Sequence, residues 1–223
     1  MRGFLAILRR DLALEARRRE SLLSMGVFAA ATLFVFRFAF DLHKVESVTV
    51  SPAVLWVTAL FAATIGLSRS FAVESAGEVM AGLLLAPVDR TAIYLAKVLS
   101  TFAVVAVVEA AAFLGLFLLF DPPEVWDPLA LLGIAWLATA GFLGAGILFA
   151  AMTRHARSGG GTLLQILLLP LSIPLFIGGV QTSERLIRGL PLGDAAKWVP
   201  MLAAFGAIYL ALGSVLFERV VEE

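Results

Sequence analysis

The sequence of 223 residues contains no cysteine. This absence excludes disulfide bonds, cysteine-ligated metal sites, thiol catalysis and covalent attachment of c-type haem. The phosphate-binding pattern G-x-x-x-x-G-K-[ST] is missing too, so any ATP would have to be hydrolysed by a separate subunit. The formal net charge is zero, which argues against a basic protein that binds nucleic acid.

Charged residues are scarce as well, at 15% of the chain, whereas soluble domains contain about a quarter. Hydrophobic residues make up 61%, and the mean hydropathy is +0.96. A soluble domain of this size could not hide so much apolar surface from water. The composition therefore predicts a membrane protein whose surrounding solvent is the lipid bilayer.

Six apolar segments are long enough to cross a hydrocarbon core, which needs about 20 residues per helix. They lie near residues 22–40, 52–72, 92–120, 129–153, 161–181 and 196–217. Short separators join them, and no shift in composition marks a second domain. We predict an all-α membrane protein with six transmembrane helices in a single domain over residues 1–223.

The distribution of positive charge predicts the orientation, because cytoplasmic loops are enriched in lysine and arginine. With the N-terminus inside, twelve of the 17 lysines and arginines fall on the cytoplasmic side and five fall outside. Both termini are therefore expected in the cytoplasm. Trp126 and Trp198 then fall at the outer interface, where such rings prefer to lie.

Residues 1–21 predict a helix with Phe4, Leu5, Leu8 and Leu12 on one side and most of its arginines on the other. This pattern is typical of a helix that lies in the membrane interface, and a short solvated tail is the alternative. Acidic residues among the arginines argue against a cleaved signal peptide.

The convergent polar groups of an enzyme are missing from the pattern. His43 and His155 fall in loops on opposite faces of the membrane, and no Ser-His-Asp set, metal-ligand spacing or paired intramembrane carboxylate occurs. An outward haem ligand at His43 is the alternative to a solvated histidine. We predict no catalytic residue, no metal ligand and no directly bound cofactor.

Glu109 lies well inside the third predicted span, where an ionisable residue suggests a functional role. The alternative is a protonated carboxyl that is hydrogen-bonded to a neighbouring helix, and Arg37 is the nearest candidate charge. In the fourth span, Gly141, Gly144 and Gly146 predict close packing of helices. Contact with a substrate is the alternative for these glycines.

The segment 73–90, between the second and third spans, has an amphipathic pattern. Apolar residues share one helical face, glutamates share another, and a proline ends the helix. A cytoplasmic helix of this kind suits docking to a soluble partner, and adsorption to lipid headgroups is the alternative. The predicted coupling residues are Glu74, Glu78, Val79, Met80, Leu83, Leu84, Pro87 and Arg90.

Two prolines, Pro170 and Pro174, interrupt the fifth span in "TLLQILLLPLSIPLFIGGVQ". Each removes a backbone donor, so the carbonyls of Ile166 and Pro170 need another partner, for which Gln165 is a candidate. We expect the helix to be kinked or broken here and to act as a hinge. A static kink shaped for packing is the alternative.

Three stretches resemble the CcmB family, the membrane subunit of the haem exporter in cytochrome c maturation. They are "ILRRDLALEARRRES", "LLLAPVDRTAIYLAKVL" and "GGGTLLQILLLPLSIPLFIGG". The glycines of "GFLGAG" fit the family too, and the resemblance spans nearly the whole chain. It implies an ABC-2-type permease architecture with an N-terminal interfacial helix and a cytoplasmic coupling helix.

The resemblance also implies partners in the bacterial inner membrane. These are a CcmA-like ATPase, CcmC-like and CcmD-like membrane subunits, and a CcmE-like haem chaperone on the outer side. A homodimer is a further expectation. The ATPase would use ATP, the complex would handle haem, and hydrolysis would serve to release the haem-loaded chaperone.

The chain departs from the family pattern in the inner segment. Where the family often has Gly-Ser/Thr-Leu-Glu, this sequence has Glu78, Val79, Met80 and Ala81, so ATPase contacts do not transfer residue by residue. The tryptophan-rich haem motif of CcmC is absent, which argues against direct haem binding. Two other functions stay open: an ABC-2 permease that exports another substrate, and a non-transporting membrane scaffold.

Overall fold

A computed structural model describes residues 2–40, 46–75, 88–120, 127–153 and 160–222. Within these ranges every element is a helix, as the bilayer requires, since lipid offers no hydrogen bonds to an exposed backbone. The elements are α1 (Arg2–Arg18), α2 (Glu20–Ala39), α3 (Ser47–Ser75), α5 (Arg90–Phe120), α6 (Pro128–Thr153), α7 (Gly160–Ile187), the short 3-10 helix η1 (Gly193–Lys197) and α8 (Trp198–Glu222).

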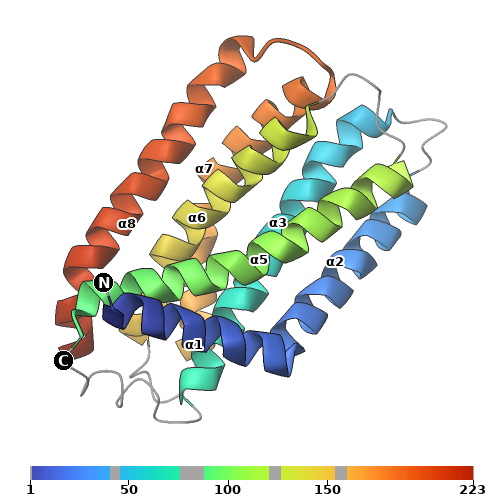
Figure 1. Ribbon diagram of the computed structural model, residues 1–223. Helices are drawn as coiled ribbons and strands as arrows, with labels where there is room; N and C mark the ends of the chain where they lie inside the picture. Colours follow the sequence, from blue (N-terminus) through green and yellow to red (C-terminus); the bar gives the residue numbers. More distant parts are fainter. Residues whose placement is uncertain (1, 41–45, 76–87, 121–126, 154–159, 223) are drawn as a thin grey trace.

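Six of the described segments are long and apolar enough to cross a membrane, which confirms the prediction of six spans in an all-α protein. They are Glu20–Ala39, Ser47–Arg69, Arg90–Phe120, Pro128–Thr153, Leu163–Ile187 and Gly193–Val221. In Figure 1 the long helices run as inclined rods, and α1 crosses them at the end where both chain termini lie. We call this end of the bundle the α1 end.

Aspartates begin two of the long helices. The Oδ1 atom of Asp127 accepts hydrogen bonds from the backbone N–H groups of Leu129 and Ala130, and Asp89 does the same for Thr91. These bonds satisfy donors that have no partner within the helix. Pro128 follows the first aspartate at a position where a missing N–H costs nothing.

The centre of the bundle is α6, which packs against α3, α5, α7 and α8. A Cβ atom at Gly141 would lie 2.9 Å from the Cα of Gly206 on α8, so the two backbones touch there. At Gly146 a Cβ would lie 2.5 Å from a methyl group of Leu67 on α3. The packing role predicted for the glycines of this span is confirmed at these contacts.

Tyr94 connects α5 to both α6 and α8. Its buried ring lies against Gly213, where an added Cβ would collide with the phenol, and next to Gly144, where a Cβ would be in ordinary contact with the hydroxyl. The hydroxyl lies 2.9 Å from the carbonyl oxygen of Gly144 and 3.2 Å from that of Tyr209, and it can donate to either. A polar tip on an apolar ring thus joins three helices inside the bundle.

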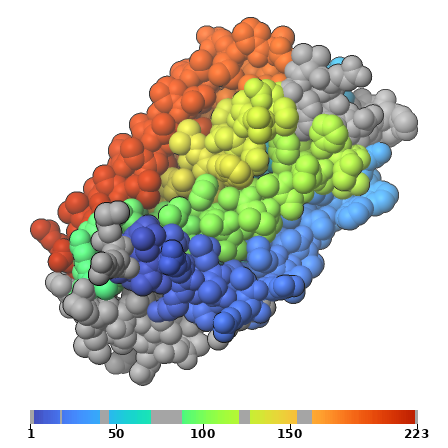
Figure 2. Space-filling view, in the orientation of Figure 1, coloured from blue at the N-terminus to red at the C-terminus, as the bar shows by residue number. Residues whose placement is uncertain are grey.

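The α1 helix is attached to the bundle by a buried ion pair. Lys97 Nζ on α5 lies 2.7 Å from Asp11 Oδ2, and the two side chains are only 6% and 11% exposed. Ile7 is also buried against the core, and Figure 2 shows α1 lying directly on α5. Arg19 makes the corner into α2 with a left-handed backbone, φ 52°. A free solvated tail, the alternative that the sequence left open, would not make these contacts.

We expect Lys97→Ala to lower the free energy of unfolding by about 1–3 kcal/mol, because it removes the closer of the two cations on Asp11 and leaves only Arg10, at 3.2 Å. Thermal unfolding in detergent, followed by circular dichroism, measures the change. Glu20→Ala is the control, since the 2.7 Å pair of Glu20 with Arg69 is exposed and should contribute at most about 1 kcal/mol. Equal effects of the two substitutions would contradict the anchoring role of Lys97.

Candidate functional site

A cleft of about 560 Å³ lies between α2, α3, α6 and α7, which is within the usual size range of small-molecule sites, about 300–1,000 Å³. Its walls are mainly apolar and aromatic, and the rings of Phe28 and Phe61 meet there with centroids 5.1 Å apart. The lining residues are Phe28, Leu60, Phe61, Thr64, Ile65, Ser68, Arg69, Phe142, Gln165, Leu168, Leu169 and Ser172.

The polar groups of the cleft gather toward the α1 end. Thr64 and Ser68 donate hydrogen bonds to carbonyls of their own helix α3, at 2.8 and 2.9 Å. Arg69 forms the ion pair with Glu20 of α2. The cleft therefore has an apolar body and a charged rim, an arrangement that suits an amphipathic guest.

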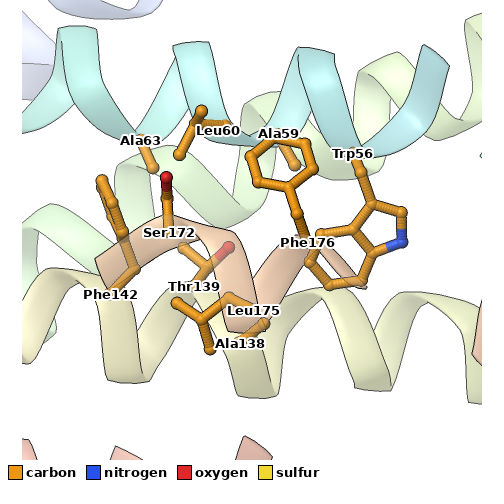
Figure 3. A pocket seen from close by; sticks show the side chains of 10 residues that line it. All are labelled: Trp56, Ala59, Leu60, Ala63, Ala138, Thr139, Phe142, Ser172, Leu175 and Phe176. Atoms are coloured by element: carbon orange, nitrogen blue, oxygen red, sulfur yellow. The ribbon is translucent and has the colours of Figure 1, made fainter. Parts of the chain in front are cut away.

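A second, smaller cavity of about 20 Å³ lies beside the cleft, between α3, α6 and α7 (Figure 3). It shares Leu60, Phe142 and Ser172 with the cleft. Trp56 forms one wall, and its indole Nε1–H donates a 2.8 Å hydrogen bond to Ser183 Oγ on α7. This bond, together with Gly179 under the indole ring, holds the half of α7 that is farther from the α1 end against α3.

Glu109 is 3% exposed, and its partner is on the neighbouring helix α6, as one of the two sequence interpretations required. Thr139 Oγ1 donates a 2.6 Å hydrogen bond to Glu109 Oε1. Among the described residues, Oε2 has no hydrogen-bond partner. The candidate charge at Arg37 lies farther from the α1 end than Glu109 does, since α2 meets α5 at Leu33 and Gly115.

The proline-containing span forms a continuous helix, Gly160–Ile187, with both Pro170 and Pro174 inside it. A break at this point, one of the two expected forms, is wrong. Gln165 lines the cleft, and the hydroxyl that bonds the backbone within the proline segment belongs to Ser172, which donates to the Leu169 carbonyl at 2.7 Å. Tertiary packing keeps the helix intact despite the missing donors.

Most of the predicted coupling residues lie outside the described part of the chain. These are Glu78, Val79, Met80, Leu83, Leu84 and Pro87, and the loop residues His43, His155 and Trp126 are outside it as well. Glu74 is in the last turn of α3, and Arg90 begins α5. Both helix ends therefore lead into the segment that the sequence assigned to coupling.

Sequence reasoning missed Thr139, Ser172 and the Asp11–Lys97 pair. A lone hydroxyl in an apolar helix usually donates a hydrogen bond to a backbone carbonyl of its own helix, as Thr58 and Thr182 do. The sequence around Thr139 therefore gives no sign that its hydroxyl bonds to another helix. Lys97 was counted only as a positive charge near the cytoplasm. No group of three or more metal-ligating side chains occurs among the described residues.

These features define an integral membrane protein of six spanning helices, with an internal cleft and a helix that crosses one end of the bundle. The family model described as CcmB protein matches residues 2–222. The chain belongs to the CcmB protein family.

Curated relatives agree with this assignment. The chain is 31% identical over 203 residues to Heme exporter protein B of Pseudomonas aeruginosa, covering 90% of this chain and 89% of the relative. It is 31% identical over 220 residues to the protein of the same name in Bradyrhizobium diazoefficiens, covering 96% and 94%. A third, from Rhodobacter capsulatus, is 31% identical over 167 residues, covering 73% and 72%.

The cleft should be reachable from the membrane face at the α1 end. Because the chain has no cysteine, single substitutions can report this without background. We expect Gln165→Cys to react with a charged, membrane-impermeant maleimide in vesicles that expose the α1 end, and Asp194→Cys in vesicles of the opposite orientation. Mass spectrometry measures the labelled fraction.

Ser183→Cys is the matched buried control, because Ser183 is 0% exposed, and it should react at least an order of magnitude more slowly. Labelling of Gln165→Cys and Asp194→Cys from the same face would show that the cleft does not open at the α1 end.

Proposed function

We propose that this protein is the membrane permease subunit of a haem exporter that acts in cytochrome c maturation. The observation that carries the proposal is the match to the CcmB family over residues 2–222. The relatives named Heme exporter protein B are covered over most of their length, so the assignment concerns the whole subunit.

ATP hydrolysis in this proposal belongs to a separate, CcmA-like ATPase subunit. The missing phosphate-binding loop supports the division of labour. The ATPase docks on segment 73–90, which Glu74 and Arg90 flank at the ends of α3 and α5. A force applied there reaches α3 and α5 directly, since the segment joins them.

The membrane is the bacterial inner membrane, with both termini in the cytoplasm. The excess of lysine and arginine in the inner loops supports this orientation. CcmC-like and CcmD-like membrane subunits and a CcmE-like chaperone complete the complex, and two copies of the permease pair as a homodimer. Haem is handled by the complex, and hydrolysis drives release of the haem-loaded chaperone.

Transport of another substrate is the main alternative, and the cleft is the feature that favours it. Its apolar walls and charged rim suit any amphipathic molecule of matching size. A scaffold without transport would need no such cleft.

Deleting the gene in its bacterial host should abolish covalently bound c-type haem and leave b-type haem unchanged. Haem staining of denatured membrane proteins measures the first, and reduced-minus-oxidised spectra measure the second. The cloned gene should restore c-type haem. Unchanged c-type haem in a strain with no second copy would refute the maturation role and leave the export of another substrate.

The two prolines of α7 provide a test of the hinge. We expect Pro170→Ala combined with Pro174→Ala to preserve the fold and the co-purification of partner subunits, but to reduce c-type haem yield severalfold. The reason is that a restored hydrogen-bond ladder stiffens the helix. Pro200→Ala, in the first turn of α8, is the matched control and should leave the yield unchanged. Full activity of the double variant would support a static role in packing.

A further inference from the structure

The small cavity beside the cleft contains two hydroxyl groups in an otherwise apolar wall. Thr139 of α6 and Ser172 of α7 both line it, and Figure 3 shows the two side chains close to each other below α3. The volume of about 20 Å³ holds about one water molecule, which needs two or more polar partners to be stable.

Each of the two hydroxyls already donates its one hydrogen bond within the protein. Thr139 donates to Glu109 Oε1 at 2.6 Å, and Ser172 donates to the Leu169 carbonyl at 2.7 Å. The indole N–H of Trp56 is engaged with Ser183. The groups that remain free in the cavity are therefore the lone pairs of two hydroxyl oxygens, which accept hydrogen bonds. A guest of this size with two donors is water.

Glu109 is buried far from compensating charge. On α5 itself, Lys97 is twelve residues away, about 18 Å along a helix, and it pairs with Asp11 of α1. No charged residue occurs in α6, from Pro128 to Thr153. The helix α1 carries charges along its length, among them Arg9, Arg10, Asp11 and Glu15, and Asp11 meets α5 at Lys97. The charged residues of α2, α3 and α8 lie near the ends of those helices: Glu20, Arg37, Arg69, Glu74, Glu218, Arg219 and Glu222. An ionised carboxylate here would be costly, so the neutral acid is favoured.

We infer that the cavity binds one water molecule, which donates to Thr139 and Ser172 and completes a route by which the carboxyl of Glu109, at rest a neutral acid, exchanges its proton with the cleft. The route begins in the cleft, because Ser172, Leu60 and Phe142 line both spaces. When Glu109 has transiently lost its proton, Thr139 passes its own proton to Oε1 and takes one from the cavity water, which in turn takes one from a hydronium ion in the cleft. Ser172 holds the water in place. The net change is one proton gained by the carboxylate, which becomes the neutral acid, and one lost by the hydronium ion, which becomes water. The same steps in reverse release the proton, so the acid exchanges with the solvent of the cleft.

Infrared spectroscopy of the purified full-length protein tests this route without any partner or haem. We expect a carbonyl stretch from a protonated carboxylic acid that disappears in Glu109→Gln and shifts on transfer to D₂O. In Thr139→Val the shift should be slower by at least an order of magnitude, because the relaying hydroxyl is gone. Thr139→Ser keeps the hydroxyl and should exchange at the wild-type rate.

Filling the cavity gives a second, independent test. Ala63→Val adds two methyl groups to the α3 wall while leaving both hydroxyls in place, and it should slow the exchange as much as Thr139→Val does. If Ala63→Val does not fold as a monodisperse protein, Ser172→Ala removes one partner of the water and should also slow exchange.

Two results would overturn the inference. One is the absence of a protonated-acid band that depends on Glu109, since the carboxyl would then be ionised. The other is a wild-type exchange rate in both Thr139→Val and the cavity variant, since protons would then reach Glu109 by another path. Neither result bears on the haem assignment, because the experiment contains no haem and no ATPase.

Discussion

The absence of water from the bilayer core is the constraint on which this structure depends. Every peptide group in the spans must find its partner within the protein, so the spans are helices. The same demand applies to polar side chains. Thr58, Thr64 and Thr182 meet it by donating to the carbonyl four residues earlier in their own helix. A few other polar side chains donate hydrogen bonds to a neighbouring helix instead. These bonds and the glycine contacts of α6 align the helices.

The bonds between helices divide α7 into two halves with different surroundings. The half farther from the α1 end is held by the Trp56–Ser183 hydrogen bond and by Gly178, which packs against the ring of Trp198. The half nearer the α1 end lines the cleft with Gln165, Leu168 and Leu169. Pro170 and Pro174 stand between the two halves, where the backbone ladder is weakest. The hinge proposed at these prolines would therefore have a held side and a side that faces the cleft, and it would couple the two ends of α7 only if both bias one two-state element.

Sequence periodicity and composition predicted the spans well, because hydropathy over 20 residues is a strong and additive signal. Close packing at Gly141 and Gly146 was also predictable, since small residues in lipid have few other uses. The candidate site was not. Thr139 and Glu109 are thirty residues apart, and the local sequence around either residue does not predict the contact with the other. Arg37, the nearest charge by sequence reasoning, lies farther from the α1 end than Glu109 because packing sets the register of α2 on α5.

The sequence by itself determined that this chain is an integral membrane protein, that it has six spanning segments and that it carries the motifs of its family. Those properties are sums over local residues, so no tertiary information is needed to obtain them. Only the tertiary structure decided that α7 stays continuous through two prolines, that Lys97 buries its charge against Asp11, and that a cleft and a cavity meet at Ser172. Each of these features depends on which helices become neighbours and at what register. The physical reason is that such contacts join residues distant in the sequence, and hydropathy averaged over a local window contains no information about them.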